Sequence, residues 1–211
     1  MSADGTAPAN DFVFTNNWFD ITAKGVWDIL IPQVNPARIL EVGSFEGASA
    51  VYLINALGKA HDLDLHCIDT WGGGIEHQDL DMAAVESRFH HNTALAVSRA
   101  TKQINLVTHK GYSDACLAKL VAEGQGESFD LVYIDGSHQA PDVLVDAVLG
   151  FKLLKVGGVM IFDDYIWSGT IPRDPILCPK IAIDAFCNIN ARKLNFIAAP
   201  ISQVYVQKIA S

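Results

Sequence analysis

The stretch Arg38-Ile-Leu-Glu-Val-Gly-Ser-Phe-Glu-Gly-Ala-Ser49 has the pattern of a buried strand, a turn bracketed by two glycines and the start of a helix. Glycine tolerates positive φ, and its lack of a Cβ lets a ligand approach the backbone, so both properties suit Gly43 and Gly47. The pattern predicts an α/β protein that holds a nucleotide-like cofactor at this turn. Ligand-free strand-to-helix turns use the same residues, so the two glycines alone do not decide between binding and structure.

The residues between the glycines indicate which cofactor fits. In the dinucleotide fingerprint G-x-G-x-x-G, a pyrophosphate lies at the helix N-terminus. Here Phe45 occupies the second glycine position, and Glu46 adds negative charge where the pyrophosphate would lie. S-adenosylmethionine (SAM) has no phosphate, and Glu41 suits its cationic methionyl end. The turn therefore favours SAM, with an NAD-dependent oxidoreductase as the alternative.

An acidic residue closes the next apolar run, Leu63 to Ile68. Asp69 at the end of this predicted strand suits the two hydroxyls of a ribose, although a turn aspartate before Gly72-Gly73-Gly74 has the same pattern. Trp71 offers a flat apolar face near the adenine position, and plain core packing explains it equally well.

Length and charge limit the classes of protein. The 211 residues fit one domain, which we place at 11–211 after a disordered stretch at 1–10. With 24 acidic and 15 basic residues, the net charge of -9 argues against nucleic acid as a partner. No apolar stretch reaches the length of a membrane span and the N-terminus lacks a signal-peptide pattern, so we expect no membrane partner.

The four cysteines show no C-x-x-C spacing and are expected to be free thiols in a reducing compartment, which predicts a cytoplasmic protein. They are Cys67, Cys116, Cys178 and Cys187.

Strand-like and helix-like segments alternate along the chain, which predicts a mostly parallel sheet with helices on both faces, a Rossmann-like three-layer α/β sandwich. Residues 193–198 and 203–208 are expected to pair as an antiparallel hairpin around Pro200. The first predicted strand runs from Arg38 into the glycine turn, and the others are 63–68, 104–109, 129–134 and 159–162. The predicted helices are about 20–31, 48–57, 81–97, 113–122, 141–154 and about 180–189. In the helix 141–154, the periodicity favours one core face and puts Asp142 and Asp146 elsewhere. The predicted core residues are Leu144, Ala147, Val148, Phe151 and Leu154.

Three aspartates follow two of the strands. Asp135 comes after 129–134, and Asp163 and Asp164 come after 159–162. The carboxyl ends of neighbouring parallel strands meet at one edge of a sheet, so we expect the carboxylates to converge beside the glycine turn. Because they would repel one another without a cation, a divalent ion such as Mg²⁺, Mn²⁺ or Ca²⁺ is the favoured interpretation. Adjacent residues of a strand point to opposite faces, so Asp163 and Asp164 both bind only if the strand has ended.

His138 lies three residues after Asp135, in a loop that opens a helix. An imidazole titrates near neutrality, so His138 can take the proton from a substrate hydroxyl. An ordinary histidine at a helix start is the alternative. Ser137 is not in the G-x-S-x-G context of a hydrolase nucleophile.

Four motifs together resemble the class I SAM-dependent methyltransferases, most closely the small metal-dependent O-methyltransferases that include macrolide-sugar and catechol-type enzymes. The motifs are 39–47 (ILEVGSFEG), 67–71 (CIDTW), 133–138 (YIDGSH) and 157–165 (GGVMIFDDY). The resemblance extends from about Trp18 to the last hairpin. It implies a seven-stranded sheet whose last strand is antiparallel, with SAM and a divalent metal as cofactors.

The resemblance also assigns roles. Asp135, Asp163 and Asp164 match the metal ligands, and His138 and Asp135 are the catalytic candidates. The candidate cofactor-binding residues are Glu41, Gly43, Ser44, Phe45, Gly47, Ser49, Asp69, Thr70, Trp71, Tyr112, Ser113 and Asp135. Gly72 to Gly74 depart from the family pattern, in which an acidic residue follows the tryptophan.

The expected reaction is in-line displacement at the SAM methyl group by a hydroxyl of a small molecule, such as a sugar or a phenol. A non-catalytic SAM-binding protein is a further alternative. The sequence leaves open the identity of the acceptor and whether the chain forms a homo-oligomer.

Overall fold

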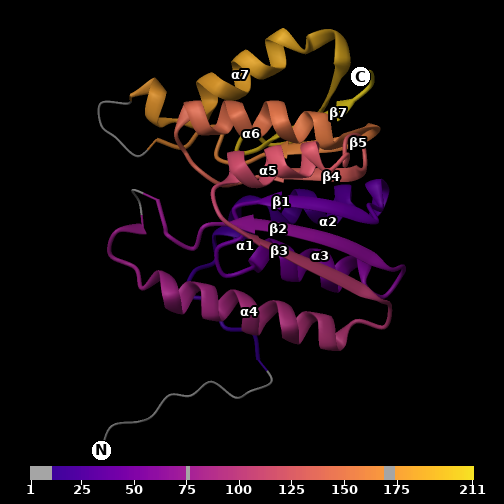
Figure 1. Ribbon diagram of the computed structural model, residues 1–211, viewed down its shortest axis with the longest axis vertical. Coiled ribbons are helices and arrows are strands. Elements are labelled where there is room, and N and C mark those ends of the chain that lie inside the picture. Colours follow the sequence, from indigo (N-terminus) through magenta and orange to yellow (C-terminus); the bar gives the residue numbers. More distant parts are fainter. Residues whose placement is uncertain (1–10, 75–76, 169–173) are drawn as a thin grey trace, which may run out of the picture.

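The computed structural model describes residues 11–74, 77–168 and 174–211, so the expected disorder of 1–10 lies outside the described residues. Seven strands form one sheet in the order β3-β2-β1-β4-β5-β7-β6 (Figure 1). The strands are β1 (Arg38–Val42), β2 (Leu63–Asp69), β3 (Ile104–Lys110), β4 (Phe129–Ile134), β5 (Leu154–Phe162), β6 (Leu194–Ile197) and β7 (Val204–Lys208).

The first five strands run parallel, and β7 pairs antiparallel with both β5 and β6. The predicted C-terminal hairpin is confirmed: Leu194 pairs with Lys208 and Ile197 with Tyr205. The predicted fold class, an α/β sheet with its last strand antiparallel, is confirmed as well. Because β1 lies between β2 and β4, the turn after β1 is flanked by the ends of both neighbours.

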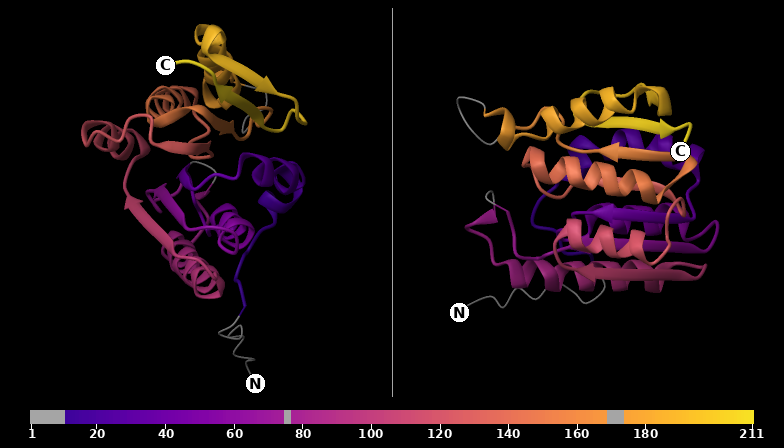
Figure 2. Two further views of the ribbon diagram at one scale, coloured as in Figure 1. Left: turned by 90° about the vertical axis from the view of Figure 1, so that its right-hand side faces the viewer. Right: turned by 45° about the horizontal axis from the view of Figure 1, so that its top comes forward.

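Helices cover both faces of the sheet (Figures 1 and 2). Side chains of α2, α3 and α4 pack on one face, and those of α5, α6 and α7 pack on the other. The helices are α1 (Trp18–Thr22), α2 (Lys24–Val34), α3 (Ala48–Leu57), α4 (Met82–Arg99), α5 (Ser113–Ala122), α6 (Ala140–Leu153) and α7 (Pro179–Ile189), with 3₁₀ turns at Pro175–Leu177 and Ala191–Lys193. The bounds of α3 and α5 match the sequence prediction.

The N-terminal helix differs from its prediction. In place of one helix over 20–31, two helices meet at Ala23, and the second continues through Pro32 to Val34. Proline removes one hydrogen bond from a helix, and here it lies in the last turn, where that loss is small. Asn35, with φ 45°, ends the helix in the left-handed conformation typical of a C-terminal cap.

Strand β5 begins five residues earlier than predicted, because the glycine pair Gly157-Gly158 lies inside the strand. The register with β4 shifts between the pairs Phe129–Leu154 and Leu131–Val159, which is a β-bulge. A Cβ on Gly158 would stand 2.9 Å from the carbonyl oxygen of Asp130. The glycines therefore allow close strand contact rather than marking the end of the preceding helix.

The core face of α6 differs from the prediction in part. Ala147, Phe151 and Leu154 are buried as predicted, together with Val143 and Gly150, whereas Leu144 and Val148 are 36% and 44% exposed. A Cβ on Gly150 would lie 3.1 Å from the Val132 side chain, so small residues let the helix approach β4 closely. The rotation brings Asp146 into the interior at 1% exposure.

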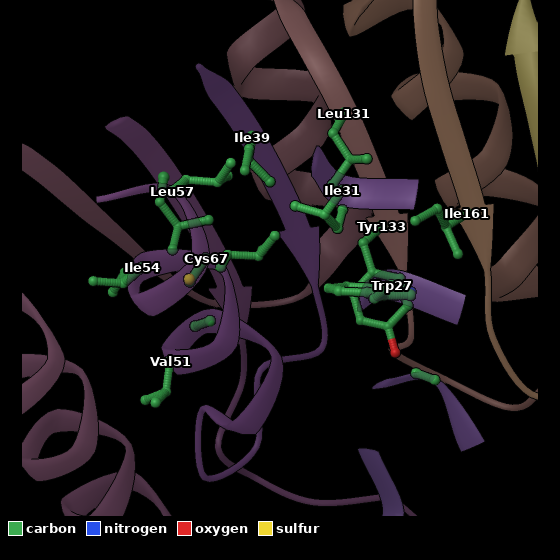
Figure 3. Packing of buried hydrophobic residues seen from close by; sticks show 14 of the residues in the cluster. Trp27, Ile31, Ile39, Val51, Ile54, Leu57, Cys67, Leu131, Tyr133 and Ile161 are labelled. Atoms are coloured by element: carbon green, nitrogen blue, oxygen red, sulfur yellow. The ribbon is translucent and has the colours of Figure 1, made fainter. Parts of the chain in front are cut away.

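The larger apolar cluster joins α2 to the sheet. The Trp27 ring packs edge-on against Tyr133 of β4, with ring centroids 4.8 Å apart. Figure 3 shows both rings among the aliphatic side chains of the cluster, with the Tyr133 hydroxyl directed away from Leu131. The hydroxyl of Tyr133 therefore points out of the apolar cluster at the C-terminal end of β4.

The structure pairs none of the four cysteines in a disulfide bond. Among the described residues, no helix is long and apolar enough to cross a membrane.

Candidate active site

The turn after β1 lies directly against the end of β4. Gly43 has φ 84°, and a Cβ placed on it would stand 1.9 Å from the carbonyl oxygen of Asp135. Gly47, with φ 82°, is the N-cap of α3, and a Cβ on it would lie 3.1 Å from the Phe89 ring. Packing therefore requires a glycine at position 43, and the positive φ that the sequence predicted favours glycine at both positions.

Asp69 holds the glycine turn. Its Oδ2 accepts hydrogen bonds from the backbone N–H groups of Ser44 and Phe45, both at 2.9 Å, and its Oδ1 accepts one from Trp71 N–H at 2.7 Å. The N–H groups that would bind a pyrophosphate are therefore already bonded to a carboxylate. This arrangement disfavours the NAD alternative. A carboxylate accepts about four hydrogen bonds, so Asp69 keeps capacity for a ribose hydroxyl.

Glu41 is fully buried under the same turn. Its carboxylate accepts hydrogen bonds from the hydroxyls of Ser44, at 2.5 Å, and Ser49. Burial raises the pKa of Glu41, and the two hydroxyls oppose the rise. Glu41 therefore stabilises the turn from its buried side, through the hydrogen bonds that it accepts from Ser44 and Ser49.

Glu46 does not face the ligand side of the turn. It is 1% exposed and forms an ion pair with Arg88 of α4 at 2.5 Å. Its two oxygens also accept hydrogen bonds from the N–H and the hydroxyl of Thr15, both at 2.7 Å. We therefore correct the prediction that Glu46 repels a pyrophosphate. Arg88 neutralises the charge of Glu46, and Asp69 is the group that occupies the anion position.

Residues 11–17 form a strap over the glycine turn, fastened chiefly by Asn92. The buried Asn92 side chain bonds both backbone groups of Val13, at 2.7 and 2.9 Å, and donates to the carbonyl of Glu46 at 2.9 Å. Trp18 extends this strap over the glycine turn, because the Trp18 ring centroid lies 5.5 Å from that of Phe45. Phe45 itself has φ 46°, which is rare for a residue with a side chain.

The other cofactor candidates surround this turn at different depths. Trp71 is 5% exposed, packs against Phe89 with ring centroids 4.8 Å apart and donates to the carbonyl of Phe45 at 2.9 Å. Its indole face is therefore occupied by core contacts. Thr70 is half-buried and accepts a hydrogen bond from Gly72 N–H. Tyr112 is 77% exposed at the start of α5, and the half-buried Ser113 follows it.

Three side chains converge beside the turn. Asp135, His138 and Asp164 each place one potential metal-ligand atom within 4.8 Å of the others. His138 Nε2 lies 2.7 Å from Asp164 Oδ2. Asp164 has φ 55°, so β5 has ended and the chain has turned there, which was the condition set from the sequence for Asp164 to reach the site. Two carboxylates and an imidazole are suitable donors for a divalent cation.

Asp163 lies beside these three side chains but does not belong to the group of converging ligand atoms. Its carboxylate accepts hydrogen bonds from the Tyr133 hydroxyl and from the Gln203 side-chain amide, the latter at 2.6 Å. The Tyr133 hydroxyl also lies 2.8 Å from Asp135 Oδ2. Burial first, and then the charges of Asp163 and Asp164, raise the pKa of Asp135 well above its ordinary value.

Sequence reasoning missed Tyr133 and Gln203 as partners of the acidic cluster. Tyr133 lies two residues before Asp135, so the period of the strand could have placed both on one face. Gln203 comes from the turn before β7, and only the strand order brings it beside Asp163.

The imidazole of His138 is covered by Trp167, with ring centroids 4.2 Å apart. A cavity of about 10 Å³, close to the volume of one water molecule, is lined by Asp135, His138, Asp163 and Asp164.

A family of methyltransferase domains matches residues 40–165, and the chain belongs to this family. The matched region contains the glycine turn, Asp69, Asp135, His138 and Asp164.

Similar proteins agree with the fold. The chain is 23% identical over 174 residues to caffeoyl-CoA O-methyltransferase 1 of Eucalyptus globulus, covering 74% of this chain and 61% of that protein. The O-methyltransferase TomG of Streptomyces achromogenes, solved with SAM, superposes with a TM-score of 0.64 and 19% identity, covering 95% of this chain and 83% of TomG. The O-methyltransferase of Bacillus cereus, solved with SAH, gives 0.60 and 18%, covering 95% and 84%. The chain spans between 50% and 66% of the length of the curated relatives that it matches.

Proposed function

We propose that this protein transfers a methyl group from SAM to a hydroxyl of a small molecule, with the help of a divalent cation. The convergence of Asp135, His138 and Asp164 beside the Gly43 turn carries this proposal. It combines a cofactor turn that is closed to phosphate with a cation-binding cluster at the same edge of the sheet.

The donor would lie along the turn. The methionyl part would contact Gly43 to Gly47, and the ribose would meet Asp69, which holds the turn in place. Two similar structures support this donor, because TomG was solved with SAM and the Bacillus cereus enzyme with SAH.

The cation would be held by Asp135 and Asp164, with Mg²⁺, Mn²⁺ or Ca²⁺ as the candidates. His138 offers a nitrogen within the same cluster, and Asp163 would have to leave Tyr133 and Gln203 to contribute. When bound, the cation would lower the pKa of the acceptor hydroxyl and thereby favour its attack.

Side chains of the protein would accept the proton that the acceptor hydroxyl loses. In the reaction the acceptor oxygen bonds to the methyl carbon, the carbon–sulfur bond breaks, and its electron pair stays on the sulfur of S-adenosylhomocysteine (SAH). The hydroxyl proton passes to His138 or Asp135. Asp164 orients the His138 ring by its contact at Nε2, and Trp167 shields one ring face from water.

The acceptor is a small hydroxylated molecule of the sugar or phenol type. The similarity to a caffeoyl-CoA O-methyltransferase supports a phenol. A cytoplasmic location is part of the proposal, and the spacing of the cysteines in the sequence, without a C-x-x-C pattern, supports it.

Calorimetry and a methyl-transfer screen test the proposal. SAM and SAH should bind, and NAD should not. A screen of phenols and sugars with Mg²⁺ should yield methylated product, and EDTA should stop it. Binding of NAD in place of SAM would refute the assignment, and turnover that is unchanged in EDTA would remove the cation from it.

A further inference from the structure

Strands β4 and β5 end at the same level of the sheet, and each is followed by an aspartate. Ile134 pairs with Phe162, and the N–H of Asp163 donates to the carbonyl of Ile134 at 2.9 Å. Asp135 and Asp163 therefore extend two strands whose backbones lie about 4.8 Å apart. Two carboxylates at this spacing repel each other, so another group must hold them together.

The hydroxyl of Tyr133 lies between these two carboxylates. It is 2.8 Å from Asp135 Oδ2, and it donates to Asp163 Oδ2. Tyr133 is buried, and the Trp27 ring packs against its ring (Figure 3). Because a side chain in a close-packed core has little freedom to turn, the hydroxyl is fixed at this position. Tyr133 thereby joins the end of β4 to the end of β5.

A second donor reaches Asp163 from the C-terminal hairpin. The amide nitrogen of Gln203 lies 2.6 Å from Asp163 Oδ2, and the amide oxygen accepts a hydrogen bond from the Tyr205 hydroxyl. Since Tyr205 occupies the amide oxygen, the amide nitrogen faces the carboxylate. Gln203 and Tyr205 are both buried. The network therefore runs through the interior and includes residues of β4, β5 and β7.

This network contacts two of the candidate cation ligands. Tyr133 contacts Asp135 directly. Asp163 reaches the second ligand, because its Oδ1 accepts a hydrogen bond from the N–H of Asp164 at 2.8 Å. That bond lies in the turn where Asp164, with φ 55°, leaves the direction of β5. Hydrogen bonds behind a ligating carboxylate orient it toward its ion.

We propose that Tyr133 and Gln203 are positioning residues for the divalent cation. They fix Asp135 directly and Asp164 through Asp163, so that the ligand oxygens are already gathered before the ion binds. The inference rests on the proposed function, because it takes a cation as the ligand of Asp135 and Asp164. A site whose ligands are held in place in the folded protein binds more tightly, since binding then orders fewer groups.

Mn²⁺ titrations followed by electron paramagnetic resonance test this role without any acceptor. Tyr133→Phe keeps the buried ring and removes the hydroxyl, so it should weaken Mn²⁺ binding by about ten- to a hundredfold. Gln203→Leu removes the amide donor and should weaken Mn²⁺ binding as well. Tyr52→Phe is the matched control, since its hydroxyl donates to the exposed Asp28 at 2.9 Å, and Mn²⁺ affinity should stay unchanged.

The double variant and SAH binding separate positioning from a general loss of structure. Tyr133 and Gln203 both act on Asp163, so Tyr133→Phe combined with Gln203→Leu should weaken Mn²⁺ binding by less than the product of the two single factors. SAH affinity, measured by calorimetry, should stay at the wild-type value, because the bonds of Asp69 to the glycine turn are untouched.

Three results would overturn the positioning role while the wild type still binds SAH and Mn²⁺. Tighter Mn²⁺ binding in Tyr133→Phe would show that the hydroxyl restrains Asp163 from reaching the ion. Unchanged Mn²⁺ affinity in both single variants would show that the network does not act on the site. An equal loss of SAH and Mn²⁺ affinity would assign both residues to the fold alone. A wild type that binds SAH but no Mn²⁺ would instead remove the cation from the proposed function, and the positioning role with it.

Discussion

Gly43 and Asp135 meet through their backbones, so that the turn after β1 and the end of β4 form one continuous edge. The hypothetical Cβ of Gly43 would stand 1.9 Å from the carbonyl oxygen of Asp135. Hard contacts of this kind are resolved only by moving the backbone. The cofactor turn and the acidic cluster therefore hold a fixed mutual position that depends on one missing side chain.

We predict that Gly43→Ala lowers the free energy of unfolding by about 3 kcal/mol or more, because it adds both a backbone clash and a strained φ. Chemical denaturation measures the loss. Gly124→Ala is the matched control, since Gly124 has φ 77° and nothing within 4 Å of its hypothetical Cβ. That control should lose only about 1 kcal/mol. Equal losses in the two variants would show that the contact with Asp135 is unimportant.

Glu46→Gln should destabilise the protein by about 2 kcal/mol, because the change removes the partner of Arg88 and one acceptor of Thr15. Hydrogen exchange should accelerate at the amides of Val13 and Thr15 before other regions respond. The control is Asp28→Asn, which alters an exposed pair with Lys24 and should leave both measurements unchanged. Unchanged protection at Thr15 would mean that Glu46 does not fasten the strap.

Two stacked histidines should make stability depend on pH. Burial lowers the pKa of both His66 and His109, whose ring nitrogens lie 3.0 Å apart. The charged groups around them are Asp64 and Arg38 near His66, and Lys119 and Glu123 near His109.

The sign follows from these lowered pKa values. The unfolded chain binds protons at its histidines near pH 6.5, whereas the folded chain resists them, so stability should fall as the pH drops below about 6.5. Urea titrations from pH 8 to pH 5 would show the slope. His109→Gln should flatten the slope, and the same change at the exposed His90 should not. A slope that persists in His109→Gln would assign the effect to other groups.

His138→Gln tests the role of the imidazole. If His138 takes the proton, kcat should fall by about 10²–10⁴ while Mn²⁺ affinity, followed by electron paramagnetic resonance, stays near the wild-type value. We predict this outcome, since Asp135 and Asp164 would still supply two carboxylates. Loss of Mn²⁺ affinity in the variant would instead make His138 a ligand of the ion.

Local sequence patterns predicted most elements of the fold. Helices α3 and α5 end where glycine or polar residues interrupt the apolar period, and the bounds of β4 match its apolar run, Phe129 to Ile134. Side-chain directions were harder to predict because they depend on partners from distant parts of the chain. Asp163 turns toward Gln203, forty residues later, and no local pattern indicates that contact.

The face of α6 shows a second limit. The periodicity correctly placed Ala147 on the core face, but it also placed Leu144 and Val148 there, and it missed Gly150, which packs closely on the sheet. Hydrophobic periodicity weighs residues by apolar size, so it does not recognise a glycine as part of a core face. The same rotation buries Asp146, which the sequence placed away from the core.

The most direct test of the account is the distance between a bound cation and the methyl group of the donor. Electron–nuclear double resonance on the protein with Mn²⁺ and SAM labelled with ¹³C at its methyl group measures it. A cation–oxygen bond of about 2.1 Å and an oxygen–carbon approach of about 3 Å limit that distance to roughly 5 Å. We expect a resolved ¹³C coupling of that range, lost in Asp164→Ala. Tight binding of both Mn²⁺ and SAM without any ¹³C coupling would contradict it.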